Sequence, residues 1–75
     1  MSLSLGELAV GQSGVICGFK FEDDHTNRLM QMGLIEGTAI KIIRVAPSGD
    51  PIEVHVAGYA LSMRKTDADA VMIEL

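Results

Sequence analysis

Cys17, His25 and His55 are the side chains of this sequence whose types could bind a metal ion or act as nucleophiles. Thiolates and imidazoles are preferred ligands of zinc and similar metals, which protein sites usually present at short, regular spacing. No second Cys or His stands at ligand spacing from any of the three. Two metal sites remain open hypotheses: a surface divalent-ion site of His25 with the adjacent Asp23 and Asp24, and a site at His55 shared between molecules. The simpler interpretation packs Cys17 in the core and leaves both histidines in solvent.

The sequence contains none of the common motifs of hydrolases and nucleotide-binding enzymes. The phosphate-binding pattern G-x-x-x-x-G-K-[ST] is absent, as are the G-x-S-x-G turn of serine hydrolases and the H-E-x-x-H zinc pair. Gly11 and Gly14 bracket only a turn signal, which is too weak to predict a phosphate-binding loop. We therefore expect neither a catalytic site nor a bound cofactor, which leaves recognition through a surface as the predicted mode of action.

The composition predicts one small folded domain over residues 1–75. Apolar residues make up 48% of the chain and charged residues 21%, which offers enough apolar surface to offset the entropy cost of ordering.

The formal net charge of −4 repels phosphate backbones, so no nucleic-acid partner is expected. No window approaches the ~18 apolar residues of a membrane-spanning helix, so no membrane insertion is expected either. The single cysteine excludes an intramolecular disulfide and favours a cytoplasmic location.

A short helix is predicted over 25–32, after an acidic run whose last member, Asp24, is the expected N-cap. Gly33 follows the helix and supplies the left-handed backbone conformation that ends many helices. Leu34 is then expected to close an apolar contact onto Leu29, as in a Schellman motif. This segment specifies structure, and nothing in it predicts catalysis.

Strand-like segments separated by Gly and Pro turns cover 15–20, 39–46, 52–57, 59–63 and 71–75. In the first segment Val15, Cys17 and Phe19 share the predicted inner face. The second segment breaks strict alternation, and a bulge near Ile42 and Ile43 is predicted to restore it while bending the strand. Such a bend suits a small barrel better than a flat sheet.

The order of these segments favours a mainly β fold: a small SH3-like antiparallel barrel of about five strands, with one short helix after the first strand. An OB-type barrel is the competing prediction, and it is less favoured because its helix normally lies between the third and fourth strands. Leu5 and Leu8 are expected to point inward from an opening turn. Near the other end, Thr66 is expected to open one helical turn through a capping box with Asp69.

Three ordered motifs resemble the FeoA family, the small cytoplasmic proteins of bacterial ferrous iron uptake. They read R-L-x-x-M-G-L-x-x-G over 28–37, R-V-A-P-x-G-D-P-I-E-V over 44–54 and G-Y-x-L-S-x-R-K over 58–65. The resemblance implies an SH3-like barrel that takes part in iron homeostasis as a non-enzymatic accessory. Its implied partner is FeoB, a membrane transporter with a cytoplasmic G-protein region, whose nucleotide turnover the accessory would regulate through direct contact.

The expected partner-binding surface lies at the end of the helix and in the turn after it, with Arg28, Met30, Gln31, Leu34 and Ile35 as its candidate residues. Methionine adapts well at protein contacts because its side chain is unbranched and polarizable. In the alternative interpretation, Leu34 is buried by its helix-closing contact and Ile35 fills the end of the barrel. Met30 would then be an isolated exposed residue of no significance.

A second function remains open beside the accessory role. The chain would be a free-standing metal-responsive module that binds iron or another transition metal ion through His25, Asp24, His55 or Cys17. Occupancy would then be transmitted through assembly, and a weak homo-oligomer is expected as a possible state of the chain in either function.

Overall fold

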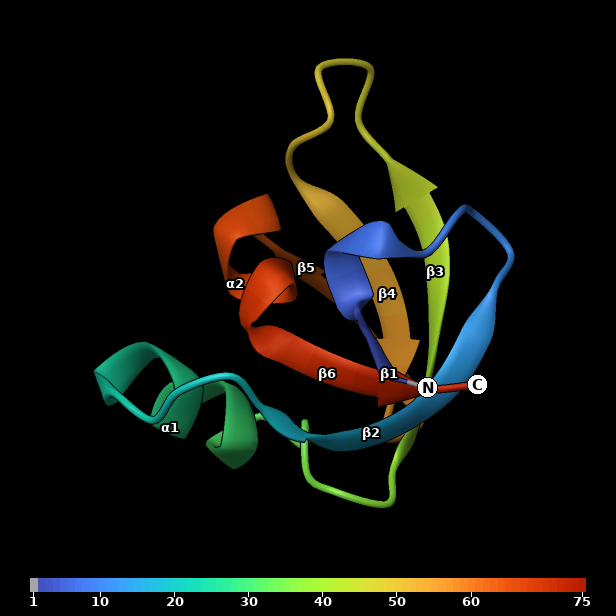
Figure 1. Ribbon diagram of the computed structural model, residues 1–75. Helices are drawn as coiled ribbons and strands as arrows, with labels where there is room; N and C mark the ends of the chain where they lie inside the picture. Colours follow the sequence, from blue (N-terminus) through green and yellow to red (C-terminus); the bar gives the residue numbers. More distant parts are fainter. Residues whose placement is uncertain (1) are drawn as a thin grey trace.

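A computed structural model describes residues 2–75 of the chain. Its elements follow one another in this order: β1 (Ser2–Ser4), the 3₁₀ turn η1 (Leu5–Glu7), β2 (Ser13–Phe19), α1 (Asp24–Gln31), β3 (Ala39–Val45), β4 (Ile52–Val56), β5 (Tyr59–Met63), α2 (Lys65–Ala70) and β6 (Val71–Glu74) (Figure 1).

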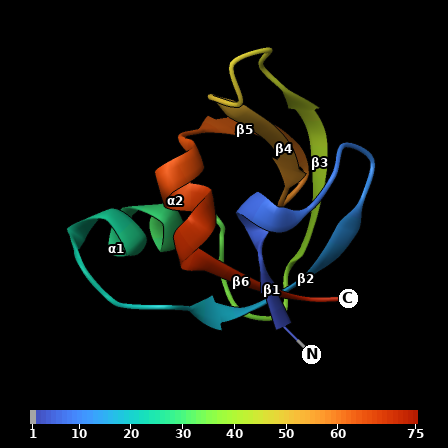
Figure 2. The ribbon, with the colours of Figure 1, turned by 45° about the horizontal axis from the view of Figure 1, so that its top comes forward.

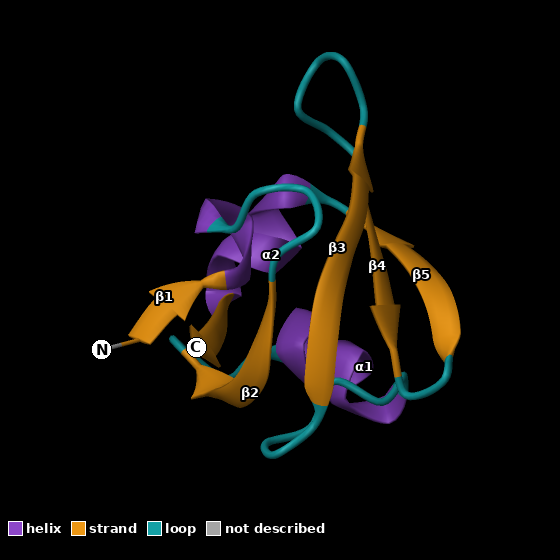
Figure 3. Ribbon diagram, turned by 90° about the vertical axis from the view of Figure 1, so that its right-hand side faces the viewer, coloured by secondary structure: helices purple, strands orange, loops and turns teal. Residues whose placement is uncertain are grey.

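The strands of residues 2–75 form one six-stranded antiparallel sheet in the order β1-β6-β2-β3-β4-β5. The sheet curves strongly around the core (Figures 2 and 3), and α2 packs against η1 beside it. The predicted mainly β, SH3-like barrel is thus confirmed. The strand count was one too low, because β1 is only three residues long and pairs with β6 from the far end of the chain.

One continuous apolar cluster fills the space inside the curved sheet. It contains Leu5 and Leu8 from the opening turn, as predicted, together with residues from α1, α2 and the strands. Ile52, Val54 and Val56 of β4 are all buried, whereas His55 between them is exposed, so the strict alternation expected there is confirmed.

The predicted inner face of the first strand was wrong. Val15 is 43% exposed and Cys17 only half-buried, whereas Ile16 is fully buried. The pairing of β2 with β6 shifts register between Ile16 and Gly18, and this irregularity moves the inward-facing positions. Phe19, beyond the shift, packs against the core as predicted.

The bulge predicted in β3 is confirmed. The pairing of β3 with β4 shifts register between Ile42 and Arg44. Ile42 is fully buried and its neighbour Ile43 is 41% exposed, so the bulge brings Ile42 to the core and turns Ile43 outward.

Both helix starts differ from the prediction. The N-cap of α1 is Asp23 rather than Asp24: the Asp23 carboxylate accepts the Thr26 N–H at 2.9 Å, and the Thr26 hydroxyl accepts the Asp23 N–H at 2.8 Å. Thr26 therefore completes a capping box that a search for Glu or Gln misses. α2 begins at Lys65, and its N-cap, Arg64, makes no side-chain cap, so the predicted capping box at 66–69 is wrong.

The last strand is shorter than predicted, because β6 ends at Glu74 and Leu75 is 68% exposed. Val71 and Ile73 are fully buried on its inner face, as expected.

Candidate partner-binding surface

The end of α1 is closed by the predicted Schellman motif. The Gly33 N–H donates to the Met30 carbonyl at 3.1 Å, and the Leu34 N–H donates to the Leu29 carbonyl at 3.1 Å. Gly33 has a φ of 106°, and Leu34 is fully buried beside Leu29. The assignment of Leu34 to an exposed patch was therefore wrong: its side chain closes the helix and is unavailable to a partner.

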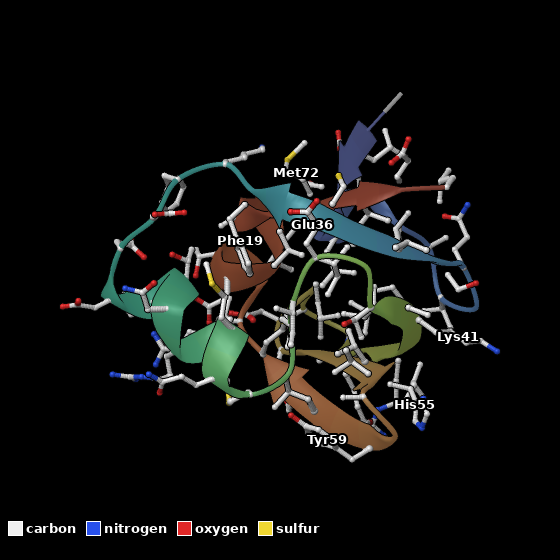
Figure 4. The ribbon with its side chains drawn as sticks, turned by 90° about the horizontal axis from the view of Figure 1, so that it is seen from below. Phe19, Glu36, Lys41, His55, Tyr59 and Met72 are labelled. Atoms are coloured by element: carbon white, nitrogen blue, oxygen red, sulfur yellow. The ribbon has the colours of Figure 1, made fainter. Side chains whose placement is uncertain are left out.

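A second set of contacts holds the end of α1 against the hairpin of β4 and β5. The Tyr59 hydroxyl donates to the Met32 carbonyl, one of the carbonyls that the end of a helix leaves without a partner. A Cβ placed on Gly33 would lie 3.0 Å from the Cβ of Ala57, so helix and hairpin approach closely. Figure 4 shows Tyr59 on β5, at the margin of the molecule. The turn after α1 is thus held in one position.

The exposed part of this region consists of Gln31, Ile35 and Glu36, with Met30 half-buried beside them. Ile35 is 54% exposed, so it does not fill the end of the barrel as the alternative interpretation required. We call Met30, Gln31 and Ile35 the helix-end surface. Arg28 adjoins it, since residues three apart on a helix are neighbours and Gln31 follows Arg28 at that spacing.

Arg28 also lines a cleft of about 510 Å³ between α1 and α2, which sequence reasoning did not predict. Its lining includes Arg28 of α1, Arg64, which is the residue before α2, and Phe21. Phe21 is 53% exposed. Among the residues described, neither arginine lies within ion-pair distance of a carboxylate, whereas Lys65 pairs with Asp69 at 3.4 Å. In the sequence, only the adjacent basic residues Arg64 and Lys65 could have indicated this cleft.

The residues considered for a metal site do not meet. Cys17 lies half-buried on β2, His25 lines the α1–α2 cleft, and His55 is exposed on β4. Over residues 2–75 no group of three or more His, Cys, Asp or Glu side chains is placed to hold a metal ion. Asp24, proposed as a partner of His25, is exposed in the first turn of α1.

A shallow apolar groove lies on the outer face of β3 and β4. It is lined by Val10, Ile43 and His55, among others, with Lys41 paired directly opposite His55 (Figure 4). Val10 is 59% exposed. The feature of the sequence that could have indicated this groove is the predicted bulge in β3, because the bulge turns Ile43 outward. No helix in the described part of the chain is long and apolar enough to cross a bilayer.

The described residues thus form a curved sheet and a helix end that backbone hydrogen bonds close, with apolar and polar groups exposed beside it. Comparison with known proteins identifies the fold. A model of the FeoA domain matches residues 3–75.

The chain belongs to the FeoA domain family.

One FeoA relative carries the domain within a much longer polypeptide. The Fe(2+) transport protein A/Fe(2+) transporter FeoB fusion protein of Porphyromonas gingivalis is 30% identical over 73 residues, which are 97% of this chain and 9% of that protein. The present chain therefore spans less than a tenth of the length of that relative.

Solved structures of FeoA proteins have the same fold. The NMR structure of a FeoA-like protein from Clostridium acetobutylicum superimposes with a TM-score of 0.92 at 34% identity, over 99% of this chain and 86% of that one. The crystal structure of Stenotrophomonas maltophilia FeoA complexed with zinc, described as a prokaryotic SH3 domain protein, gives 0.84 at 24% identity, over 96% and 89%. The second likeness supports the SH3-like fold alone.

Proposed function

We propose that this chain is a non-enzymatic accessory protein of bacterial ferrous iron uptake, which binds the cytoplasmic G-protein region of a FeoB transporter from the cytoplasmic side. The observation that carries the proposal is the fusion of a FeoA domain to FeoB in the Porphyromonas gingivalis relative. Two domains joined in one polypeptide act in the same place and at fixed stoichiometry, which is what a stable contact between separate chains would also provide.

The contact is assigned to the helix-end surface with Arg28 at its border. Ile35 supplies exposed apolar area, and methionine and arginine are enriched in protein interfaces. The Schellman closure and the Tyr59–Met32 hydrogen bond hold this backbone in place before binding. Less conformational entropy is then lost when a partner docks, because the surface is already ordered.

Regulation of nucleotide turnover would be exerted through this contact. The chain has no phosphate-binding loop of its own, so any hydrolysis belongs to the partner. An accessory of this kind alters the partner's nucleotide cycle by binding one nucleotide state more tightly than another. Titrations with and without guanine nucleotide test that part of the proposal.

Ile35→Glu is expected to weaken binding to the purified cytoplasmic domain of FeoB by at least about tenfold, which corresponds to ~1.4 kcal/mol. A buried carboxylate without a partner is costly at an interface, whereas the side chain is solvated in the free chain. The measurement is the Kd by calorimetry or biolayer interferometry. Met30→Glu is expected to weaken binding in the same direction.

Val10→Glu is the matched control, because Val10 is 59% and Ile35 54% exposed and Val10 lies in the outer groove of β3 and β4. Its affinity should equal that of the unmodified chain. If Val10→Glu weakens binding and Ile35→Glu does not, the partner docks on the outer groove. If folded chain shows no binding in any nucleotide state, the accessory role through this domain is wrong.

A further inference from the structure

Strand β5 forms an open edge of the sheet. It is last in the strand order and is hydrogen-bonded to β4 alone in the described part of the chain. Figure 3 shows it as the outermost strand, with its free side facing away from the rest of the sheet. The opposite edge is β1, which has only three residues. Of the two edges, β5 is the longer one and the better template for another strand.

The backbone groups on the free side of β5 can be identified from the hairpin. Ala57 and Gly58 form a two-residue turn, so Val56 and Tyr59 on either side of it are a hydrogen-bonded pair. Hydrogen-bonded and non-hydrogen-bonded pairs alternate along an antiparallel ladder. The amides and carbonyls of Ala60 and Ser62 therefore point away from β4.

None of the hydrogen bonds found among residues 2–75 uses these outward groups of Ala60 and Ser62. Both residues are exposed. The segment Tyr59–Met63 contains no proline and no charged residue, the devices with which proteins normally block an open edge. The edge is thus unpaired and unprotected.

We propose that β5 pairs with β5 of a second copy of the chain, antiparallel and about a two-fold axis at Leu61. In this register Ala60 lies opposite Ser62 of the second copy and Ser62 lies opposite its Ala60. All of the outward amides and carbonyls then find partners at once, because opposed residues with outward groups exchange two hydrogen bonds per pair. The strand is complementary to itself in this register, which a two-fold symmetric interface requires.

Side chains support the same register. The half-buried Leu61 meets Leu61 of the second copy across the axis, on the inner face of the sheet, where a close non-hydrogen-bonded pair covers its remaining apolar area. On the outer face Ala60 and Ser62 are small enough for the strands to approach. Because Tyr59–Met63 carries no charge, the repulsion between two copies of net charge −4 is not concentrated at the contact.

A contact made by one short strand is small, so the association is weak and depends on concentration. It uses the free side of β5, whereas the proposed transporter contact uses Met30, Gln31 and Ile35 at the end of α1. The two proposals rest on different residues and are tested by different measurements, although Tyr59 of β5 contacts the end of α1.

Two double variants test the register directly. Ala60→Lys with Ser62→Lys places two lysines opposite each other in each pair and should weaken dimerisation at least tenfold. Ala60→Lys with Ser62→Glu places lysine opposite glutamate at the same positions and should dimerise at least as well as the unmodified chain. Analytical ultracentrifugation over ~10 µM to 1 mM gives the Kd, and circular dichroism verifies folding.

Amide exchange in the unmodified chain gives a second measurement that needs no variant. The Ala60 and Ser62 amides should exchange more slowly as protein concentration rises, whereas the Leu61 amide, bonded to Val54 within one copy, should not change. A chain that remains monomeric up to 1 mM overturns the proposal, as do equal dimerisation by both double variants and protection that appears only when the transporter domain is added.

Discussion

Gly33 combines two constraints at a single position. Its φ of 106° lies in a region that side chains rarely adopt, and a Cβ there would lie 3.0 Å from the Cβ of Ala57. The first constraint follows from the Schellman motif and was predictable from sequence. The second comes from the hairpin of β4 and β5, which only the folded structure brings beside the helix.

Gly33→Ala should lower the free energy of unfolding by about 1–3 kcal/mol, the cost of a side chain in a strained backbone conformation. Gly37→Ala is the matched control, since Gly37 has a φ of 92° but a Cβ added to it would meet nothing within 4 Å. Urea denaturation of both variants separates backbone strain from the contact with Ala57. Equal losses in the two variants would show that the close approach adds nothing.

At the scale of elements, the hairpin turn between β3 and β4 and the start of α2 are joined by one side chain. The Asp50 carboxylate accepts the Lys65 N–H at 3.0 Å, fifteen residues away in sequence. Lys65 is the first residue of α2, so this amide has no acceptor within the helix. Asp50 thus performs the capping that Arg64 does not.

Asp50→Ala should destabilise the protein by about 0.5–2 kcal/mol, as the loss of a helix cap does elsewhere. Asp50→Asn keeps a side-chain oxygen that can accept the same hydrogen bond and should recover most of that loss. Chemical denaturation measures both. A stability that is unchanged in Asp50→Ala would mean that water satisfies the Lys65 amide equally well.

Elements set by local signals were predictable, and those set by distant pairing were not. The closure of α1, the bulge in β3 and the alternation of β4 depend on residues within a few positions of each other. The inner face of β2 was mispredicted because the register of β2 depends on its pairing with β6. The cap of α2 was mispredicted because the acceptor of the Lys65 amide is Asp50, which is distant in sequence. The α1–α2 cleft was missed for the same reason, since Arg28 and Arg64 come to line one cleft only in the fold.

At the scale of the whole molecule, we expect residues 1–75 to unfold as one unit. Residues from both helices and from the strands share one apolar cluster, and Tyr59 ties α1 to the sheet. Tyr59 is the one tyrosine of the sequence, which has no tryptophan, so tyrosine fluorescence reports that contact specifically.

The urea transitions followed by Tyr59 fluorescence and by far-ultraviolet circular dichroism should therefore coincide, as in a two-state reaction. Tyr59→Phe, followed by circular dichroism because it lacks the tyrosine, should lower the free energy of unfolding by the loss of one hydrogen bond, about 0.5–1.5 kcal/mol. A fluorescence transition that precedes the dichroism transition would show that α1 detaches first and that the helix-end surface is not rigid.

The pairing of β1 with β6, which sets Ser2 opposite Glu74, has a consequence for covalent tethering. Any polypeptide continuing beyond Leu75 departs beside the first strand, on the side away from α1 (Figure 1). In a fused arrangement a short linker would keep the proposed helix-end surface near the transporter at an effective concentration of about millimolar, so that a weak contact would suffice. As a separate chain, the domain must supply the whole affinity from its own surface.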